Sequence, residues 1–395
     1  MTALLLAALP SAAAEPQAPY GECRAGYWTG NRNLDDTGGI AKATCFVNWK
    51  QTLADKVRMA AAVRAGRNDA GSADRTQLRV REAYVEAERE AWRVRLGRQI
   101  VAWGRADRIN PTDSLGPRDY TLLAPEDEEQ RLGVDALSLV RHLSGELDLA
   151  LIAVPRFRPH GMPQGSLPAN RRLDAPDDGE WALKLDKAGS GWDASLSYYN
   201  GFERQPRWFA QPVQGGLLFR GAYRTQRTLG VDAAAAFGAW NTRMEWASSR
   251  LAYDCAVCPA GRQTVHRAVI GVDRDLGENA NLNLQLFGIR RNRYTSPAGQ
   301  AAGALDRLNS EFAAIETGFS LRAHTRLLND RLKLELGAVG DFTGDSYVLR
   351  PRLYYSVSDR WRLTAGLDHF HGRPQSYFGV RARNRVAFAE MALLF

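Results

Sequence analysis

The stretch Asn-Leu-Asn-Leu-Gln-Leu-Phe at residues 281–287 decides the fold class, together with Arg-Leu-Lys-Leu-Glu-Leu-Gly at residues 331–337. In both stretches leucine alternates with a polar or charged residue, which gives a β-strand one apolar face and one polar face. A helical period of 3.6 residues would scatter the same leucines around the axis. Residues 92–96 and 361–367 repeat the alternation, so the sequence predicts an all-β protein.

Short turns alternate with long polar segments between these strand-like stretches, and pairs such as Ser144-Gly145 and Asn329-Asp330 mark the turns. Eight short turns are expected near residues 52–55, 90–91, 143–145, 188–191, 238–240, 275–279, 327–331 and 357–360. Nine longer connections are expected near residues 31–40, 67–75, 105–131, 158–179, 201–216, 253–264, 293–310, 343–346 and 373–384. Seventeen connections imply 18 strands; 16 is the alternative, because residues 22–30 have the weakest strand pattern.

This alternation of short and long connections is typical of transmembrane antiparallel β-barrels, whose short turns face the periplasm and whose long loops face outward. Within hydrocarbon every backbone N–H and C=O needs an internal partner, and only a closed sheet has no unpaired edge. We therefore expect residues 15–395 to form a single barrel with an apolar exterior and a water-filled, charged interior.

The composition agrees with a barrel and excludes several other classes. The chain has 395 residues, of which 45% are apolar and 24% charged, with 10 Trp, 13 Tyr and 14 Phe. That much apolar surface excludes a disordered chain. No run of about 18 apolar residues is present, which excludes a polytopic helical membrane protein. The net charge of +8 is spread over all the predicted strands, so we expect no nucleic-acid partner.

The two ends of the chain carry an expected export signal and an expected assembly signal. Residues 1–14 are interpreted as a signal peptide, with an apolar run at residues 3–9 and small residues before a cleavage point after Ala14. The amphipathic segment 386–395 ends in Phe395, which resembles the signal that the outer-membrane barrel-assembly machinery recognises. We expect a location in the outer membrane of a Gram-negative bacterium, with outer-membrane lipid and the barrel-assembly machinery as partners.

The cysteines and histidines point to disulfides and away from catalysis. Cys23 and Cys45 flank a short polar segment, and Cys255 and Cys258 lie close together, so two short-range disulfides fit an oxidising compartment. A zinc site would need a second close cysteine pair. The six histidines form no metal-ligand pattern, and Asp368 and His369 fall on opposite faces of one strand. We expect no metal, no cofactor and no enzymatic activity.

The inward-facing charges are the candidate functional residues of the barrel wall. The alternation places the following basic and acidic residues inside: Arg93, Arg95, Arg243, Lys333, Arg350, Arg352, Arg360, Arg362, Glu245, Asp273, Glu335, Asp368 and Glu390. Arginine supplies 46 of the 52 basic residues. Two interpretations stand. The guanidinium groups guide an anionic solute, or they pair with carboxylates across strands and stiffen the wall.

The longest connection, residues 105–131, contains the turn-forming pairs Asn110-Pro111 and Gly116-Pro117, so we expect it to be ordered. Either it folds into the lumen and narrows the channel, or it lies over the rim of the barrel. If it narrows the channel, the following residues are the candidate constriction charges: Arg105, Arg108, Asp113, Arg118 and Asp119.

Several motifs carry a resemblance to a known group. Leu-Gly-Arg-Gln-Ile-Val-Ala-Trp-Gly-Arg at residues 96–105 is followed by Asn-Pro-Thr-Asp at residues 110–113 and Gln-Arg-Leu-Gly-Val-Asp at residues 130–135. These motifs resemble proteobacterial outer-membrane barrels allied to the alginate-export porins, many of unassigned function. The sequences at residues 229–232 and 238–245 are similar to that group's mid-barrel hairpin. The resemblance implies an 18-stranded barrel for passage of a solute, such as an anionic saccharide or organic molecule.

We therefore predict a porin-like channel for a polar solute, with an anionic solute favoured if the arginines guide it. Two alternatives stay open: a structural sheath around a partner protein, including a periplasmic one, and a surface barrel that transports nothing.

Overall fold

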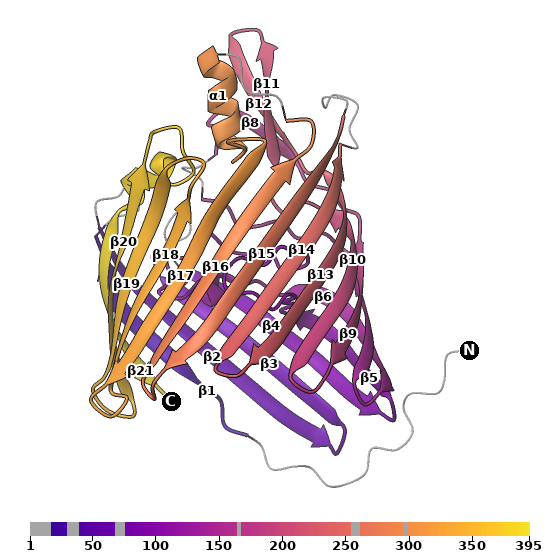
Figure 1. Ribbon diagram of the computed structural model, residues 1–395, viewed down its shortest axis with the longest axis vertical. Helices are drawn as coiled ribbons and strands as arrows, with labels where there is room; N and C mark the ends of the chain where they lie inside the picture. Colours follow the sequence, from indigo (N-terminus) through magenta and orange to yellow (C-terminus); the bar gives the residue numbers. More distant parts are fainter. Residues whose placement is uncertain (1–16, 30–38, 68–75, 164–166, 254–260, 295–298) are drawn as a thin grey trace.

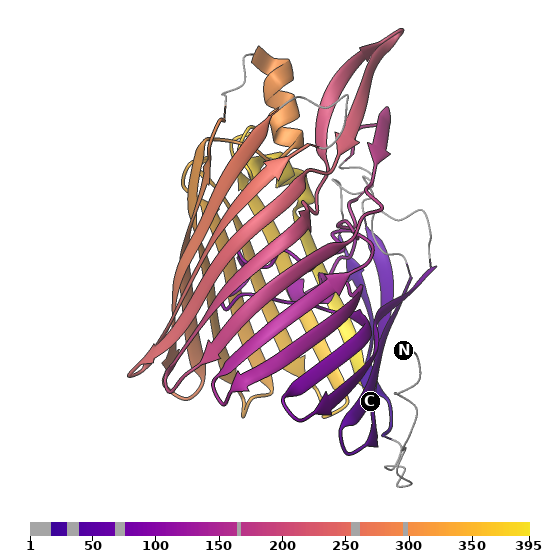
Figure 2. The same ribbon diagram turned by 90° about the vertical axis from the view of Figure 1, so that its right-hand side faces the viewer.

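Eighteen antiparallel strands form one closed barrel in the computed structural model, as the sequence predicts (Figures 1 and 2). The structure describes residues 17–29, 39–67, 76–163, 167–253, 261–294 and 299–395. The predicted signal peptide and the candidate pair Cys255 and Cys258 lie outside the described residues. Each barrel strand pairs with its neighbours along the chain, and the ring closes where the first strand pairs with the last. The alternative of 16 strands is therefore wrong.

The bounds of the barrel strands in chain order are β1 (Tyr20–Trp28), β2 (Ile40–Ala54), β3 (Val57–Arg67), β4 (Thr76–Arg89), β5 (Trp92–Gln99), β6 (Val134–Ser144), β7 (Leu147–Val154), β9 (Glu180–Ala188), β10 (Trp192–Phe202), β13 (Thr225–Phe237), β14 (Trp240–Ala252), β15 (Arg262–Leu276), β16 (Ala280–Arg291), β17 (Ile315–Leu327), β18 (Leu332–Asp341), β19 (Ser346–Ser356), β20 (Trp361–Gly372) and β21 (Val386–Leu394).

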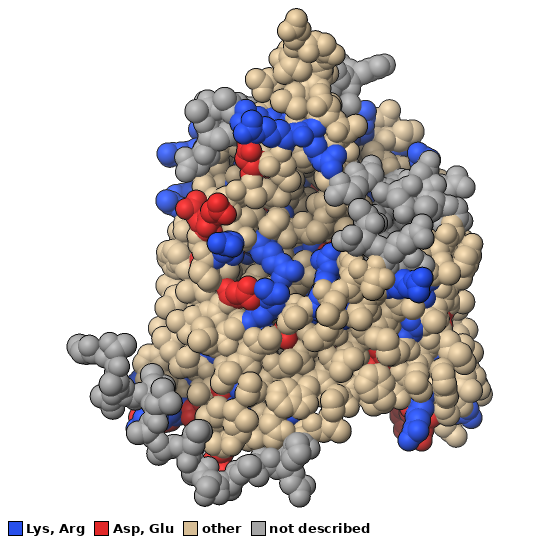
Figure 3. All heavy atoms as spheres, turned by 180° about the vertical axis from the view of Figure 1, so that it is seen from behind, with Lys and Arg blue, Asp and Glu red and all other residues tan. Residues whose placement is uncertain are grey.

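The two faces of the strands separate as the alternation predicts. On β16, Leu284 is 39% exposed on the outer surface, whereas the neighbouring Gln285 is only 1% exposed on the inner side. On β18, Leu334 and Leu336 are exposed while Glu335 between them is buried. Seen from behind, the lower half of the wall is largely free of charged side chains, which gather above it and at its lower edge (Figure 3). The barrel thus has an apolar band on its outer surface, as transmembrane barrels do.

Tryptophans mark the short-turn end of this band. Trp92, Trp192, Trp240 and Trp361 each begin a strand directly after a short turn, and all four are exposed. Arg141 lies 4.7 Å from the centre of the Trp92 ring. A ring with an apolar body and a polar N–H fits the boundary between hydrocarbon and headgroups, and a long basic side chain beside it reaches water.

The opposite end carries extra elements that the sequence pattern did not predict. A small sheet of β8 (Arg171–Asp174), β11 (Arg207–Val213) and β12 (Gly216–Ala222) projects beyond the barrel beside α1 (Gly299–Leu308) (Figure 1). Two short 3-10 helices also lie in long connections, η1 (Asp127–Gln130) and η3 (Gly379–Asn384). The eight short turns are confirmed. The expected long loop at residues 343–346 is wrong, because only residues 342–345 separate β18 from β19.

Among the described helices, none has the length and apolar content that a membrane-spanning helix needs.

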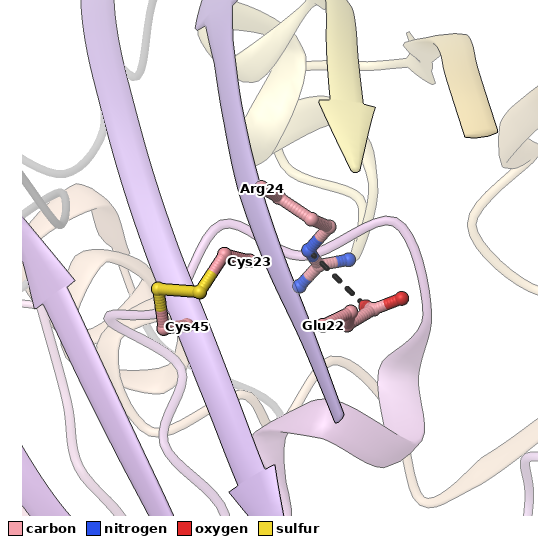
Figure 4. Close-up of a disulfide and its surroundings, with 4 residues drawn as sticks. All are labelled: Glu22, Cys23, Arg24 and Cys45. Carbon is pink, nitrogen blue, oxygen red and sulfur yellow. Dashed lines mark ion pairs between the residues drawn. A yellow bond between two sulfur atoms is a disulfide. The ribbon is translucent and has the colours of Figure 1, made fainter. Parts of the chain in front are cut away.

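The seam between β1 and its two neighbours is strengthened on both faces. Cys23 and Cys45 face each other across β1 and β2 and form the expected disulfide on the outer face, while Arg24 points the other way, toward Glu22 (Figure 4). On the inner face Trp28 stacks on Phe388 with ring centres 4.0 Å apart. The Trp28 Nε1–H also donates to a carboxylate oxygen of Glu390 at 2.8 Å.

The last residue completes the ring. The backbone N–H of Gly21 donates to the carbonyl of Phe395 at 2.8 Å, and the N–H of Phe395 donates back to Gly21 at 3.1 Å. Phe395 itself is exposed on the outer surface. Its role as an assembly signal stays a prediction.

We expect Trp28→Ala to lower the free energy of unfolding by about 3–5 kcal/mol, because the ring is 1% exposed and the change removes both the stacking and a buried hydrogen bond. Urea unfolding of the detergent-solubilised barrel measures the loss. Trp192→Ala is the control, because that ring faces outward, and it should cost much less. Equal losses would show that the seam is not specially stabilised.

Candidate functional site

The segment between β5 and β6 runs through the inside of the barrel, where it can be seen in Figures 1 and 2. β5 has only 8 residues, so the chain leaves the wall partway along it. The segment then contacts the inner face on opposite sides of the barrel, from β1 and β4 to β14 and β19. We call residues 100–133 the crossing segment.

The carboxylate of Glu245 on β14 holds the start of the crossing segment. Its Oε1 accepts hydrogen bonds from the backbone N–H groups of Arg105 and Ala106, both at 2.6 Å. Its Oε2 accepts from the backbone N–H of Thr112 at 3.2 Å and from the hydroxyl of Thr112 at 2.9 Å. Glu245 is 1% exposed, and an unpaired carboxylate at this depth would be costly. Its position therefore fixes the backbone of the segment.

Gly104 allows this close approach. Its φ of +94° is a conformation that residues with a side chain rarely adopt. A Cβ at this position would also lie 2.5 Å from a carboxylate oxygen of Glu245. Glycine is needed here for both reasons.

Arg105 joins the segment to a second side of the wall. Its guanidinium forms ion pairs with Asp232 on β13 and with Asp186 on β9, the second at 2.5 Å. Ser195 donates to the other oxygen of Asp232. A guanidinium that bridges two carboxylates makes charge-assisted hydrogen bonds in several directions and fixes its own position.

Arg108 and Asp107 reach a third part of the wall. Arg108 pairs with Glu335 on β18 at 3.4 Å, and the same carboxylate also accepts from Arg322 at 3.0 Å and Lys333 at 2.8 Å. Asp107 lies 3.8 Å from the Arg322 guanidinium. Charges of both signs alternate here, so the segment and the wall neutralise each other.

The end of the crossing segment is held on the other side of the lumen. Asp127 pairs at 2.5 Å with Arg350 on β19, which also contacts Asp368 at 3.0 Å. Burial disfavours the charged form of Asp127, but the nearby Arg350 and Arg108 outweigh this effect and lower the pKa of the carboxyl. Glu129 accepts from Arg24 on β1 at 2.9 Å. The segment is thus anchored at both ends.

The middle of the crossing segment is held by an ion pair within the segment and by contacts with the wall and with His160. Arg131 contacts Asp113 at 2.6 Å, and Asp119 pairs with Arg79 of β4 at 3.1 Å. The backbone N–H of Arg118 donates to Nδ1 of His160 at 2.8 Å. That bond requires Nδ1 to carry no proton. Burial, together with Arg204 and Arg118, lowers the pKa of His160 to about 3.

A cavity of about 600 Å³ lies on the long-loop side of the crossing segment. Its lining includes Arg108, Asp127, Arg204, Arg267 and Arg350. Most of these charges have partners. Arg204, for example, pairs with Glu180 at 2.9 Å. Arg267 on β15 and Arg243 on β14 are unlike these paired arginines. Neither forms an ion pair with a carboxylate in the part of the chain that the structure describes.

The structure places most of the candidate residues in or on the lumen. Glu245 binds the crossing segment directly, whereas Arg95 pairs with Glu86 at 2.5 Å and Arg362 pairs with Glu22. Arg93 lies 4.0 Å from Glu88, near the short turns, and Arg352 pairs with Asp368. The prediction that Arg360 faces the lumen is wrong. It is an exposed turn residue, because β20 and its alternation begin only at Trp361.

Sequence reasoning missed two anchors, Asp186 and Asp232. Both lie inside by the same alternation: Leu183 and Leu185 face outward on β9, which turns Asp186 inward, and Leu229 does the same for Asp232 on β13. The alternation was therefore sufficient to find them. Their pairing with Arg105 depends on where the crossing segment runs.

A family of proteins of unknown function, DUF1302, matches residues 22–250, which is more than half of the chain. The chain belongs to the DUF1302 family. No curated protein matches this member in sequence. The family match does not test the predicted alliance with the alginate-export porins, which stays a prediction.

Solved outer-membrane proteins share the fold of this DUF1302 protein. OccAB1 of Acinetobacter baumannii matches with a TM-score of 0.61 and 10% identity over 95% of each chain. OccK5 (OpdH) of Pseudomonas aeruginosa matches with a TM-score of 0.57 and 12% identity, over 95% of this chain and 96% of its own. OpdK of the same organism, solved with vanillate, matches with a TM-score of 0.57 and 12% identity, over 95% and 97%. At these identities the likeness establishes the barrel architecture.

We expect Glu245→Ala to release the start of the crossing segment, because several buried N–H groups lose one charged acceptor. Hydrogen exchange at the amides of Arg105, Ala106 and Thr112 should accelerate by about 10- to 100-fold, the range for a lost hydrogen bond to a charged group. Glu86→Ala is the matched control. It removes a buried lumenal carboxylate that pairs with Arg58 and Arg95 of the wall. Unchanged exchange in the Glu245 variant would contradict the anchoring.

We expect His160 to make the protein less stable in acid. Its pKa is lowered in the folded barrel, so the unfolded chain binds more protons as the pH falls below about 6.5, and stability is lost from there toward about pH 3. His160→Asn cannot titrate. Between pH 7 and pH 4, the free energy of unfolding of wild type, measured in urea, should fall by at most about 3 kcal/mol more than that of this variant. Identical pH dependence of the two proteins would refute the neutral, buried histidine.

Proposed function

We propose that this DUF1302 protein is a passive outer-membrane channel for a small polar solute, and that it favours anions. The observation that carries the proposal is the crossing segment, which is fixed to opposite walls by ion pairs and hydrogen bonds and narrows the lumen. A long ordered loop inside a barrel of this width acts as a size filter.

Two arginines support the anion preference. Arg267 on β15 pairs in register with Ala247, two residues on the long-loop side of Glu245, and Arg243 lies two residues on the short-turn side. One arginine therefore lies on each side of the crossing segment. Neither forms an ion pair with a carboxylate of the described residues, so we infer that each guanidinium can contact an anion that passes the constriction.

The other lumenal arginines serve the wall. Arg105, Arg350 and Arg352 are paired with carboxylates, so the two interpretations of the arginine content apply to different residues. Pairing that stiffens the wall accounts for most of them, and anion guidance accounts for the unpaired ones.

The alternative functions fit less well. A sheath needs space for a partner inside the lumen, where the crossing segment already contacts strands on opposite walls. A surface barrel without transport would not need a cavity of about 600 Å³ that opens to charged side chains beside the crossing segment. OpdK, which shares the fold, has been solved with the small carboxylate vanillate.

The reversal potential of the reconstituted barrel in a salt gradient tests the proposal. Wild type should prefer anions, and Arg267→Gln and Arg243→Gln should each move the reversal potential toward the cation side, because each removes one unpaired positive charge from the path. Arg360→Gln, in an exposed turn, is the control and should change nothing. A barrel that conducts no current overturns the channel, and a cation preference in wild type overturns the anion preference.

A further inference from the structure

A group of arginines on the outside of the barrel plays no part in the lumen. Arg227, Arg250, Arg262 and Arg293 line a groove of about 840 Å³ at the long-loop ends of β10, β13, β14 and β15. All four are exposed. Arg290, at the same end of β16, lies opposite His266 and is also exposed. We call these five residues the outer arginine cluster.

The strand alternation shows that the cluster faces away from the lumen. Arg227 shares its face of β13 with Leu229, which is 43% exposed, and Arg250 shares its face of β14 with Trp246 and Met244, which are also exposed. Arg290 follows Leu284 and Leu286 on the outer face of β16. Arg227, Arg250 and Arg290 therefore lie directly above residues of the apolar band, and Arg262 and Arg293 line the same groove as Arg227 and Arg250.

The cluster is not neutralised by the protein. Arg227 and Arg250 stand directly opposite each other in the antiparallel register of β13 and β14, a placement that costs stability when the charges are alike. Within the described ranges, none of the five forms an ion pair with Asp or Glu, whereas Arg105, Arg322 and Arg350 in the lumen do so. Asp178 is the one carboxylate in the groove lining and makes no ion pair there.

The surroundings fit a headgroup that has both charge and hydroxyl groups. Asn200 and Thr264 line the same groove and offer neutral donors beside the guanidinium groups. Just below, Trp246 and His266 stack with ring centres 6.0 Å apart on the outer face. An aromatic belt with basic residues above it is typical of the level where acyl chains meet headgroups.

We propose that the outer arginine cluster is a binding site for the phosphate groups of an anionic lipid in the leaflet at the long-loop side. The cluster lies at headgroup height, it faces lipid, and its like charges need an anion between them. A phosphate oxygen accepts from two guanidinium groups at once and removes the repulsion between Arg227 and Arg250. The proposal depends on the membrane position of the barrel and not on what passes its pore.

Native mass spectrometry of the whole barrel in neutral detergent tests the site, with a short-chain phosphatidic acid and the matching phosphatidylcholine as probes. Wild type should retain the phosphatidic acid selectively. The double variant Arg227→Gln/Arg250→Gln should bind it about 30-fold more weakly, since each arginine near an anionic lipid contributes about fivefold. Arg172→Gln/Arg220→Gln is the matched control, because it removes two arginines from the projecting sheet at the same end.

Heat-dependent gel mobility first establishes that the variants are folded barrels. Equal retention of the two lipids by wild type, or unchanged retention of phosphatidic acid by the folded double variant, overturns the site. Ten millimolar inorganic phosphate distinguishes the source of the anion. If it displaces the lipid completely, the cluster is a site for free anions and the lipid proposal is wrong. Retained lipid supports the proposal.

Discussion

Backbone hydrogen bonding in a solvent that offers no partners is the constraint on which this structure depends. Inside a bilayer an unpaired N–H or C=O costs several kcal/mol, so a sheet must close on itself. The chain closes by pairing β1 with β21, where Phe395 and Gly21 exchange two backbone hydrogen bonds. The Cys23–Cys45 disulfide and the Trp28–Phe388 stack reinforce this closing strand from its two faces.

Closure of the sheet creates a lumen, and the crossing segment then determines how wide that lumen is. Many of the segment's charged side chains meet an opposite charge on the wall, and the wall also binds its backbone. Glu245 accepts hydrogen bonds from backbone N–H groups of the segment. Arg105 forms ion pairs with Asp186 and Asp232, and Asp127 forms an ion pair with Arg350. Buried pairs of this kind add little net stability, but breaking one leaves an uncompensated charge, so they favour a single position of the segment. A fixed segment gives the lumen a defined width.

The sequence was sufficient to predict the barrel, the strand number and the eight short turns, because a period of two residues is a local property of each strand. The same alternation predicted that Glu245 and Arg350 face the lumen. The predicted inward position of Arg360 was wrong, because the alternation of inward and outward side chains does not extend into the turn before Trp361. The sequence did not reveal β8, β11 and β12, whose pairing joins residues 171–174 to 219–222 across a whole hairpin. The pairing of Arg105 with Asp186 and Asp232 was out of reach for the same reason, because β9 and β13 become neighbours of the segment only after the barrel has closed.

The most direct test of this account is the single-channel conductance of the barrel in a planar bilayer, with residues 105–131 intact or replaced by a short Gly-Ser bridge. A segment that crosses the lumen blocks most of the path, so its removal should raise the conductance several-fold while the folded barrel keeps its heat-dependent mobility. Equal conductance of the two folded proteins would mean that ions do not pass the crossing segment, and the account of the lumen would be contradicted.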